Sequence, residues 1–272
     1  MKSLCFSAVR KPASTLILPS QRRLLSVSRA LLQEKKESKK KPVDFNPRHL
    51  GVAAQIYIPT SYKNLPNVFA HPITFFNSLI RRVYTFGLNT VQVGLFRYQS
   101  GLKPKFLLWK NRAIETYVNV NSAFAHRKLE EVKPIVSLWV EEALEARARQ
   151  LPKNVKLDWQ LIKFNHVPKL VSVQAMMIPG KPLENIQLVY KFDTAQRLIK
   201  YNKVTNEAEK LDRNVVDYVV FLCDATTNDL ILLGSVFESK PDEKLPKTYE
   251  DDNQIAIERM KESGDLFRLP SK

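Results

Sequence analysis

The apolar pattern of the chain changes its period at Pro152, and this change limits the fold more than any other feature. Before it, residues 104–126 and 134–150 repeat apolar side chains at helical spacing, with Pro134 opening the second helix. After it, the period falls to two and β-branched and aromatic residues dominate. Helices followed by consecutive antiparallel strands predict an α+β fold, with N-terminal helices packed on a curved antiparallel sheet.

The alternating pattern after Pro152 predicts six strands and two hairpin turns. The first hairpin is expected to turn at 193–196 and the second at 226–229. A short helix over 252–262, ending at Gly264, is expected in the tail. The expected strands are 156–165, 170–178, 187–193, 197–202, 215–224 and 230–238.

The N-terminus has the composition of a mitochondrial presequence. Residues 1–33 contain six basic residues, frequent serines and no acid, as transit peptides do. Arg23-Leu24-Leu25-Ser26 resembles a matrix-peptidase site, with cleavage after Leu24 or after Leu25. A disordered basic tail is the alternative interpretation. Residues 34–44, with five lysines against three acids, are expected to form a flexible linker.

The excess positive charge of the mature chain lies before Glu115. Residues 45–114 hold nine basic residues and no acid, whereas residues 115–272 hold 23 basic and 24 acidic residues. Twelve of the 26 aromatic residues also lie between positions 45 and 109. Basic charge mixed with aromatic rings suits an anionic phospholipid surface or RNA. The simpler alternative places the rings in the core and the charges on a solvated rim.

A helix is expected to begin at His71-Pro72 and to end at Gly87. With Arg81 and Arg82 beside its apolar stripe, it fits a membrane interface and equally fits packing on its own domain. The stripe comprises Ile73, Phe75, Phe76, Leu79, Ile80, Val83 and Phe86. Three glycines are spaced by seven, either along one side of a continuous helix or in separate turns: Gly87, Gly94 and Gly101.

The chain offers no catalytic constellation, so we predict no enzymatic activity, no cofactor and no metal. Its glycines match neither phosphate-binding loop spacing. Cys223 is the only thiol outside the presequence and is expected in the core. No apolar run approaches the roughly 18 residues that span a bilayer. The four histidines lack the spacing of a helical metal site: His49, His71, His126 and His166.

Long stretches of the sequence resemble the family of fungal mitochondrial inner-membrane ribosome receptors. The resemblance extends from about Asp44 to Pro270, whereas residues 1–43 are similar only in character. The stretches that carry it are DFNPRHLGVAAQIYIP (44–59), YKNLPNVFAHP (62–72), LIRRVYTFGLNTVQVGLFRYQSG (79–101), FLLWKNRAIETYVNVN (106–121), LDWQLIKFN (157–165) and DYVVFLCDATTND (217–229).

That resemblance implies a fold and a place in the cell. The family is similar in fold to the membrane-binding domain of the import-motor docking subunit and to an animal mitochondrial large-subunit ribosomal protein. It implies a domain on the matrix side of the inner membrane that binds the large ribosomal subunit, through rRNA and exit-site proteins. The exit site would then face the membrane insertase, with nascent chains and anionic lipids as further partners.

Charge and pattern, rather than the family, suggest which residues make these contacts. We expect a core domain at 104–238, preceded by a basic extension at 45–103 and followed by a tail at 239–272. The interface-helix candidates are Phe75, Phe76, Leu79, Arg81 and Arg82. The candidates for electrostatic contacts with ribosome or lipid are Lys35, Lys36, Lys39, Lys40, Lys41, Arg48, Arg97, Lys103, Lys105, Lys110 and Arg112.

Three other functions are compatible with the sequence. One is a small-ligand binder or enzyme with a pocket between helices and sheet, lined by Trp159, Tyr190, Phe192 or Tyr218. A buried acid with a shifted pKa, for which Asp217 is the candidate, would favour it. The second is an import-motor component, which would need a longer N-terminal region. The third is a permanent ribosomal protein, which would leave the membrane with the ribosome.

Overall fold

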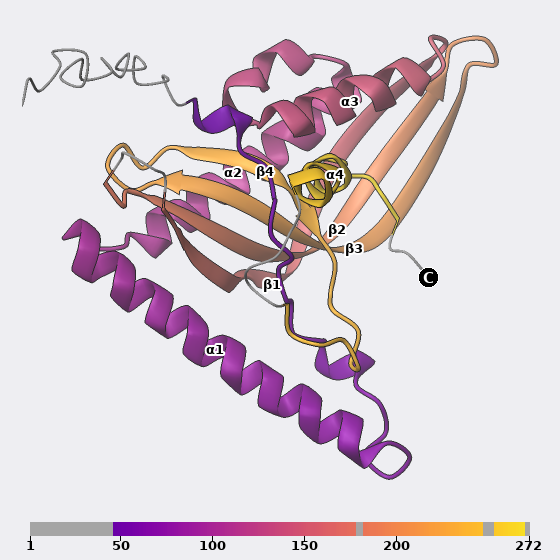
Figure 1. Ribbon diagram of the computed structural model, residues 1–272. Helices are drawn as coiled ribbons and strands as arrows, with labels where there is room; N and C mark the ends of the chain where they lie inside the picture. Colours follow the sequence, from indigo (N-terminus) through magenta and orange to yellow (C-terminus); the bar gives the residue numbers. More distant parts are fainter. Residues whose placement is uncertain (1–45, 178–181, 247–252, 270–272) are drawn as a thin grey trace, which may run out of the picture. The chain divides into compact units, whose positions relative to one another are not determined.

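Among the residues described by a computed structural model, four antiparallel strands in consecutive order form one sheet (Figure 1). The strands are β1 (Val155–Met176), β2 (Asn185–Asn202), β3 (Glu207–Asp224) and β4 (Leu230–Val236). Together with the four α-helices of the described residues they confirm the α+β class. The structure describes residues 46–177, 182–246 and 253–269, which belong to one compact unit. The predicted presequence and linker lie outside these residues.

The predicted turn at residues 193–196 is wrong, because these residues lie in the middle of β2. Asp193 pairs with Val216 of β3, and Gln196 pairs with Arg213. Polar residues are tolerated here because their side chains find partners, as in the hydrogen bond from Asn165 to Asp193. The chain turns instead at 203–206. The predicted second hairpin, turning at 226–229, is confirmed.

The first two predicted strands are also one strand, β1. Pairing with β2 continues across Pro168, through register shifts between Phe164 and His166 and between His166 and Lys169. β1 is an edge strand, where proline and bulges are tolerated because no further strand needs the missing donor.

Helix α2 (Phe106–His126) agrees with the helix predicted over 104–126, and α4 (Asn253–Gly264) agrees with the predicted tail helix. Helix α3 (Leu138–Gln150) begins four residues after Pro134, the predicted start. Ser137 is its N-cap, and its side chain accepts a hydrogen bond from the backbone of Val140. A serine cap satisfies an amide that has no partner within the helix. Pro134 lies instead in a 3₁₀ turn, Lys133–Ile135.

Helix α1 (Pro72–Ser100) does not end at Gly87, as predicted, but continues through Gly87 and Gly94. It ends at Gly101, whose φ of 69° is the left-handed conformation that glycine adopts easily. Two interior glycines cost about 1 kcal/mol each relative to alanine. Contacts along the whole helix offset that cost. Gly87 and Gly94 therefore lie in one continuous helix and not in separate turns.

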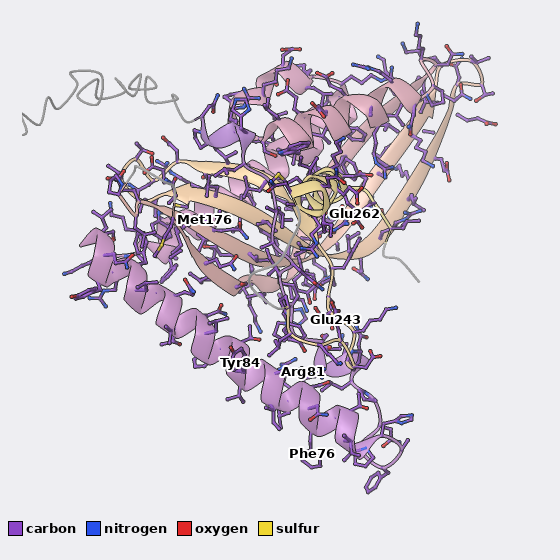
Figure 2. All side chains as sticks on the ribbon, viewed as in Figure 1. Phe76, Arg81, Tyr84, Met176, Glu243 and Glu262 are labelled. Atoms are coloured by element: carbon purple, nitrogen blue, oxygen red, sulfur yellow. The ribbon has the colours of Figure 1, made fainter. Side chains whose placement is uncertain are left out.

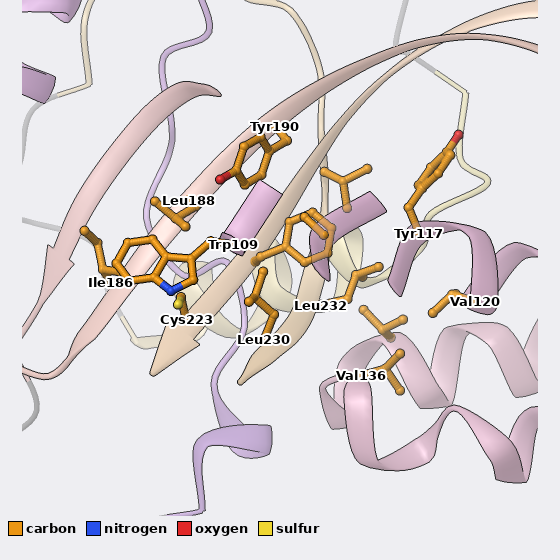
Figure 3. Close-up of a cluster of buried hydrophobic side chains, with 14 of the residues drawn as sticks. Trp109, Tyr117, Val120, Val136, Ile186, Leu188, Tyr190, Cys223, Leu230 and Leu232 are labelled. Carbon is orange, nitrogen blue, oxygen red and sulfur yellow. The ribbon is translucent and has the colours of Figure 1, made fainter. Parts of the chain in front are cut away.

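Successive residues of the strands point to opposite faces of the sheet, where they contribute to two apolar clusters, one on each face. On the helix face, Trp109 of α2 packs beside Ile186 and Leu188 of β2 (Figure 3), and Tyr117 of α2 stacks on Phe192 of β2 with ring centroids 4.6 Å apart. On the other face, a strap of residues 50–60 packs through Val52 and Ile58. The aromatic residues of the basic stretch are accordingly divided: Tyr57, Phe96 and Trp109 are buried, whereas Phe69, Phe76, Phe86 and Tyr98 are exposed.

Candidate functional site

The outer side of α1 is apolar and exposed, the reverse of an ordinary surface helix. Figure 2 shows Phe76 projecting away from the rest of the protein. We call the following residues the outer stripe, since helical spacing places them on one side of α1. They are between 55% and 89% exposed: Ile73, Phe76, Ile80, Val83, Tyr84, Val91 and Tyr98.

The side of α1 that faces the protein is largely polar, and its hydrogen bonds hold the helix in place. Ser78 and Arg81 both donate to the carbonyl oxygen of Pro241, at 3.0 and 2.9 Å. Arg82 donates to the carbonyl oxygen of Thr60 in the strap. These bonds join α1 to segments on either side of it in the chain, so its orientation is defined by contacts.

Two amide side chains of α1 bind the free edge of β1. Asn89 donates to the carbonyl oxygen of Val171 at 2.8 Å and accepts from the backbone amide of Val173 at 3.1 Å. The amide of Ala175 donates to Gln92 at 3.2 Å. Unpaired edge groups invite pairing with another chain, and α1 covers this part of the edge. The inward polar face of α1 therefore has a structural use, and its outward apolar face has no partner among the described residues.

The structure separates the five interface-helix candidates. Phe76 and Leu79 are exposed, whereas Phe75 is half-buried beside the ring of Phe76. Arg81 and Arg82 point into the protein. Val91 and Tyr98 were not predicted, because the predicted helix ended at Gly87, and Tyr84 lies within that predicted helix but was not assigned to its apolar stripe. The apolar repeat continues beyond that glycine at the same helical spacing and could have revealed Val91 and Tyr98.

The electrostatic candidates also fall into groups. The five lysines of the linker lie outside the described residues. Arg48 donates to the carbonyl oxygen of Val136 at 3.1 Å and pairs with Glu141, and Arg112 pairs with Asp229 at 3.1 Å. In the described part of the chain the remaining four form no ion pair, and they flank the connection between α1 and α2: Arg97, Lys103, Lys105 and Lys110.

A pocket of about 350 Å³ lies between α2 and the helix face of the sheet. Trp159 lines it, together with Asp217, but Tyr190 and Phe192 are core residues and Tyr218 faces the strap. Burial raises the pKa of Asp217, although the hydrogen bond that it accepts from Tyr117 at 2.5 Å acts in the opposite direction.

Polar side chains connect the floor of this pocket. Trp159 donates to Gln196 at 2.9 Å, and Gln196 donates to the hydroxyl of Tyr117 at 2.7 Å. Burial and the neighbouring Asp217 raise the pKa of Tyr117 well above its ordinary value. The arrangement holds Asp217 in place and leaves its neighbour Tyr117 a poor proton donor at neutral pH.

The remaining reactive side chains form no further centre in the described part of the chain. Burial raises the pKa of the Cys223 thiol, which lies in the core. Within the described ranges, no three residues among His, Cys, Asp and Glu are placed to hold a metal ion. In those same ranges, no helix combines the length and the hydropathy needed to cross a membrane.

Comparisons with known proteins agree with this sequence and structure. The family model described as "MBA1-like protein" matches residues 36–272. The chain is 68% identical over 264 residues to a Saccharomyces cerevisiae protein, covering 95% of each chain. That protein is called "Inner membrane mitoribosome receptor MBA1, mitochondrial".

Proposed function

Because the chain belongs to the MBA1-like protein family, we propose that it is a receptor that holds mitochondrial ribosomes at the inner membrane. The name of the yeast relative supports both the ribosome and the membrane as partners. The observation on this chain that carries the membrane side is the outer stripe of α1. The ribosome side is supported by the unpaired cations beside the connection from α1 to α2.

The outer stripe fits insertion into the interface of a bilayer, parallel to its plane. Removing a large apolar side chain fully from water contributes about 1.5–3 kcal/mol. The seven members of the stripe are already held on one side of a 29-residue helix by the polar bonds beneath it. Little conformational entropy is therefore lost when the stripe binds. Helix α1 also carries no acid that would repel an anionic lipid surface.

The ribosome side of the proposal rests on electrostatic attraction to rRNA phosphates. Arg97, Lys103, Lys105 and Lys110 are assigned to this contact, with the lysines of 34–44 as an additional arm. Arg48 and Arg112 are assigned to structure, because each already has a carboxylate partner. The receptor would hold the exit site of the large subunit toward the insertase, where nascent chains leave the ribosome.

A catalytic function is not part of the proposal. The Asp217 pocket is the single observation that favours a second candidate, a small-ligand binding site, because its carboxyl is buried with a raised pKa. Acid–base catalysis requires groups that exchange protons near neutral pH. Its hydrogen-bonded neighbour, Tyr117, has a pKa shifted away from that range.

Co-sedimentation of residues 34–272 with mitochondrial large ribosomal subunits, and flotation with cardiolipin-containing vesicles, tests the proposal. We expect binding to both, with ribosome binding weakening steeply as salt rises. Replacing Arg97, Lys103, Lys105 and Lys110 by glutamate should weaken ribosome binding. The matched control replaces four exposed lysines at the far end of the sheet by glutamate: Lys153, Lys156, Lys203 and Lys210.

Two of the competing functions predict different results. Binding to neither partner at low salt contradicts the proposal and directs attention to the Asp217 pocket. Ribosome binding without vesicle binding indicates a permanent ribosomal protein. Equal loss in the quadruple variant and its control would remove the assignment of the four residues, because general charge would then explain the binding.

A further inference from the structure

A groove of about 690 Å³ lies between α1 and the strap face of the sheet. Arg82 and Phe86 of α1 form one side of it, and the segment that follows the strap contributes Lys63. β1 contributes Lys169 and β2 contributes Lys191. The groove is distinct from the outer stripe, because it lies behind the helix, and from the Asp217 pocket, which lies on the other face of the sheet.

Two lysines on the floor of this groove form a repulsive pair. Lys169 of β1 and Lys191 of β2 are directly opposite each other in the pairing register. Residues opposite each other in a sheet share a face, and like charges at such positions destabilise it. Lys191 also lies over the ring of Tyr218, at 5.4 Å. An anion bound between the two ammonium groups would relieve the repulsion.

The two carboxylates of the groove are occupied by other donors. Asp193 accepts hydrogen bonds from Asn165 at 3.0 Å and from the ring of His166 at 2.7 Å. Those contacts hold the pKa of Asp193 below its usual value, with the Asn165 bond as the largest cause. Glu238 accepts from the backbone amide of Ser61 and from the side chain of Asn64. Within the described residues, neither carboxylate lies at ion-pair distance from Lys169 or Lys191, although the charge of Lys191 helps to lower the pKa of Asp193 and opposes the burial that raises the pKa of Glu238.

The groove also exposes apolar side chains beside these cations. Phe86, Val167 and Val216 line it and are 73%, 68% and 48% exposed. Phe86 lies on the flank of α1, between the outer stripe and the groove. A ligand for this site should therefore carry both an anionic group and an apolar chain. A phospholipid has both, whereas RNA supplies phosphates without an alkyl chain.

We propose that this groove binds one anionic phospholipid, with its phosphate between Lys169 and Lys191 and an acyl chain along Phe86 and Val167. The inference rests on the proposed function, because it takes the lipid from the membrane on which α1 lies. It adds a specific lipid site to a general apolar contact. The receptor would then distinguish anionic from zwitterionic lipid, which the uncharged outer stripe cannot do.

Titration calorimetry of the full chain with monomeric dihexanoyl phosphatidylglycerol tests the site without a bilayer. The test variant is Lys169→Gln with Lys191→Gln, which removes both charges and keeps a polar side chain that is one atom shorter. The control, Lys156→Gln with Lys210→Gln, makes the same charge change on exposed β1 and β3 positions. We expect at least about tenfold weaker lipid binding in the test variant, the size expected for lost charge-assisted hydrogen bonds, and unchanged binding in the control.

Three outcomes would overturn the lipid site. The first is equal binding of phosphatidylglycerol by wild type and the Lys169/Lys191 variant, or no binding by wild type. The second is equal affinity for inorganic phosphate, which would make it a phosphate site. The third is displacement of the lipid by a short RNA at lower concentration, which would assign the groove to RNA. Weaker binding of dihexanoyl phosphatidylcholine supports the proposal.

Failure of the proposed function gives a separate result. The proposed function is overturned when wild type neither floats with vesicles nor sediments with ribosomes. The binding of monomeric lipid is measured independently of both assays. Vesicle flotation that persists while the Lys169/Lys191 variant keeps full lipid affinity would overturn the groove alone.

Discussion

Helices α1 and α2 are neighbours in sequence, but they present opposite sides to the protein. α2 buries Trp109, Ala113 and Val120 against the sheet, as an amphipathic helix of a soluble domain does. α1 turns the polar side chains Ser78, Thr85 and Asn89 toward the protein and leaves its apolar stripe outside.

The difference shows what holds each helix in place. Apolar burial fixes α2, whereas hydrogen bonds to carbonyl groups and to the edge of β1 hold most of α1, and only Phe96 near its C-terminal end is fully buried in the core. Hydrogen bonds give a modest net stabilisation in water but define orientation, because they require particular geometry. α1 is thus oriented largely by polar contacts, and the seven side chains of its outer stripe stay exposed.

The largest expected effect tests this contrast through stability. Trp109→Ala in α2 should lower the free energy of unfolding by about 3–5 kcal/mol, because the ring is fully buried. Phe76→Ala in α1 should change it by less than about 0.5 kcal/mol. Urea denaturation followed by circular dichroism measures both. A comparable loss in the two variants would mean that the outer stripe is part of the folded core.

The second prediction concerns membrane binding. Replacing Ile80 and Val83 by glutamate removes two exposed apolar side chains, worth about 1.5 kcal/mol each if buried in lipid. Vesicle binding should therefore fall about a hundredfold in flotation assays, while the unfolding free energy stays within about 0.5 kcal/mol of wild type.

A matched double variant controls for added negative charge. Ile162→Glu and Val204→Glu place two acids at other exposed apolar positions, on β1 and in the turn between β2 and β3. Vesicle binding should change little. If this control loses as much binding as the variant of α1, the loss reflects net charge, and the outer stripe has no special part in it.

Periodicity predicted α2 and the second hairpin well, because each element repeats one pattern between clear breaks. It failed for α1, since a glycine at Gly87 weakens a helix by only about 1 kcal/mol and the contacts of Asn89 with β1 compensate. Those contacts join residues far apart in sequence, so no local pattern could reveal them. The same reason explains the error at Asp193, whose partners come from β1.

The candidate site was predicted in character but not in detail. The acid-free, aromatic-rich composition of residues 45–114 indicated an unusual surface, and its exposed aromatic residues include Phe76 and Tyr98. Composition does not tell which charged side chains fold inward. Arg81, Arg82 and Arg112 bind groups of the protein itself, and only the folded structure places those carbonyl and carboxylate groups beside them.

The third prediction examines the polar underside of α1. Asn89→Ala removes the acceptor for the Val173 amide and the donor to Val171, at a cost of about 1–2 kcal/mol. Asn77→Ala, an exposed position on the same helix, should cost less than about 0.5 kcal/mol. Hydrogen exchange should show faster exchange of the Val173 amide in the first variant only. Unchanged protection there would mean that α1 is held by other contacts.

The smallest expected effect concerns Asp217, the carboxyl that α2 covers through Tyr117. The pKa of Asp217 is raised by burial, so the folded protein binds its proton more tightly than the unfolded chain does. This contribution favours folding at pH values below the unfolded pKa and is lost as pH rises through the folded pKa. The amide in Asp217→Asn carries no charge at any pH, so the unfolding free energy of this variant minus that of wild type should increase across this window. Denaturation of both proteins at several pH values measures the difference. A pH-independent difference would show that the pKa of Asp217 is the same in the folded protein and in the unfolded chain. The burial of this carboxyl beneath α2 would then impose no electrostatic cost on folding.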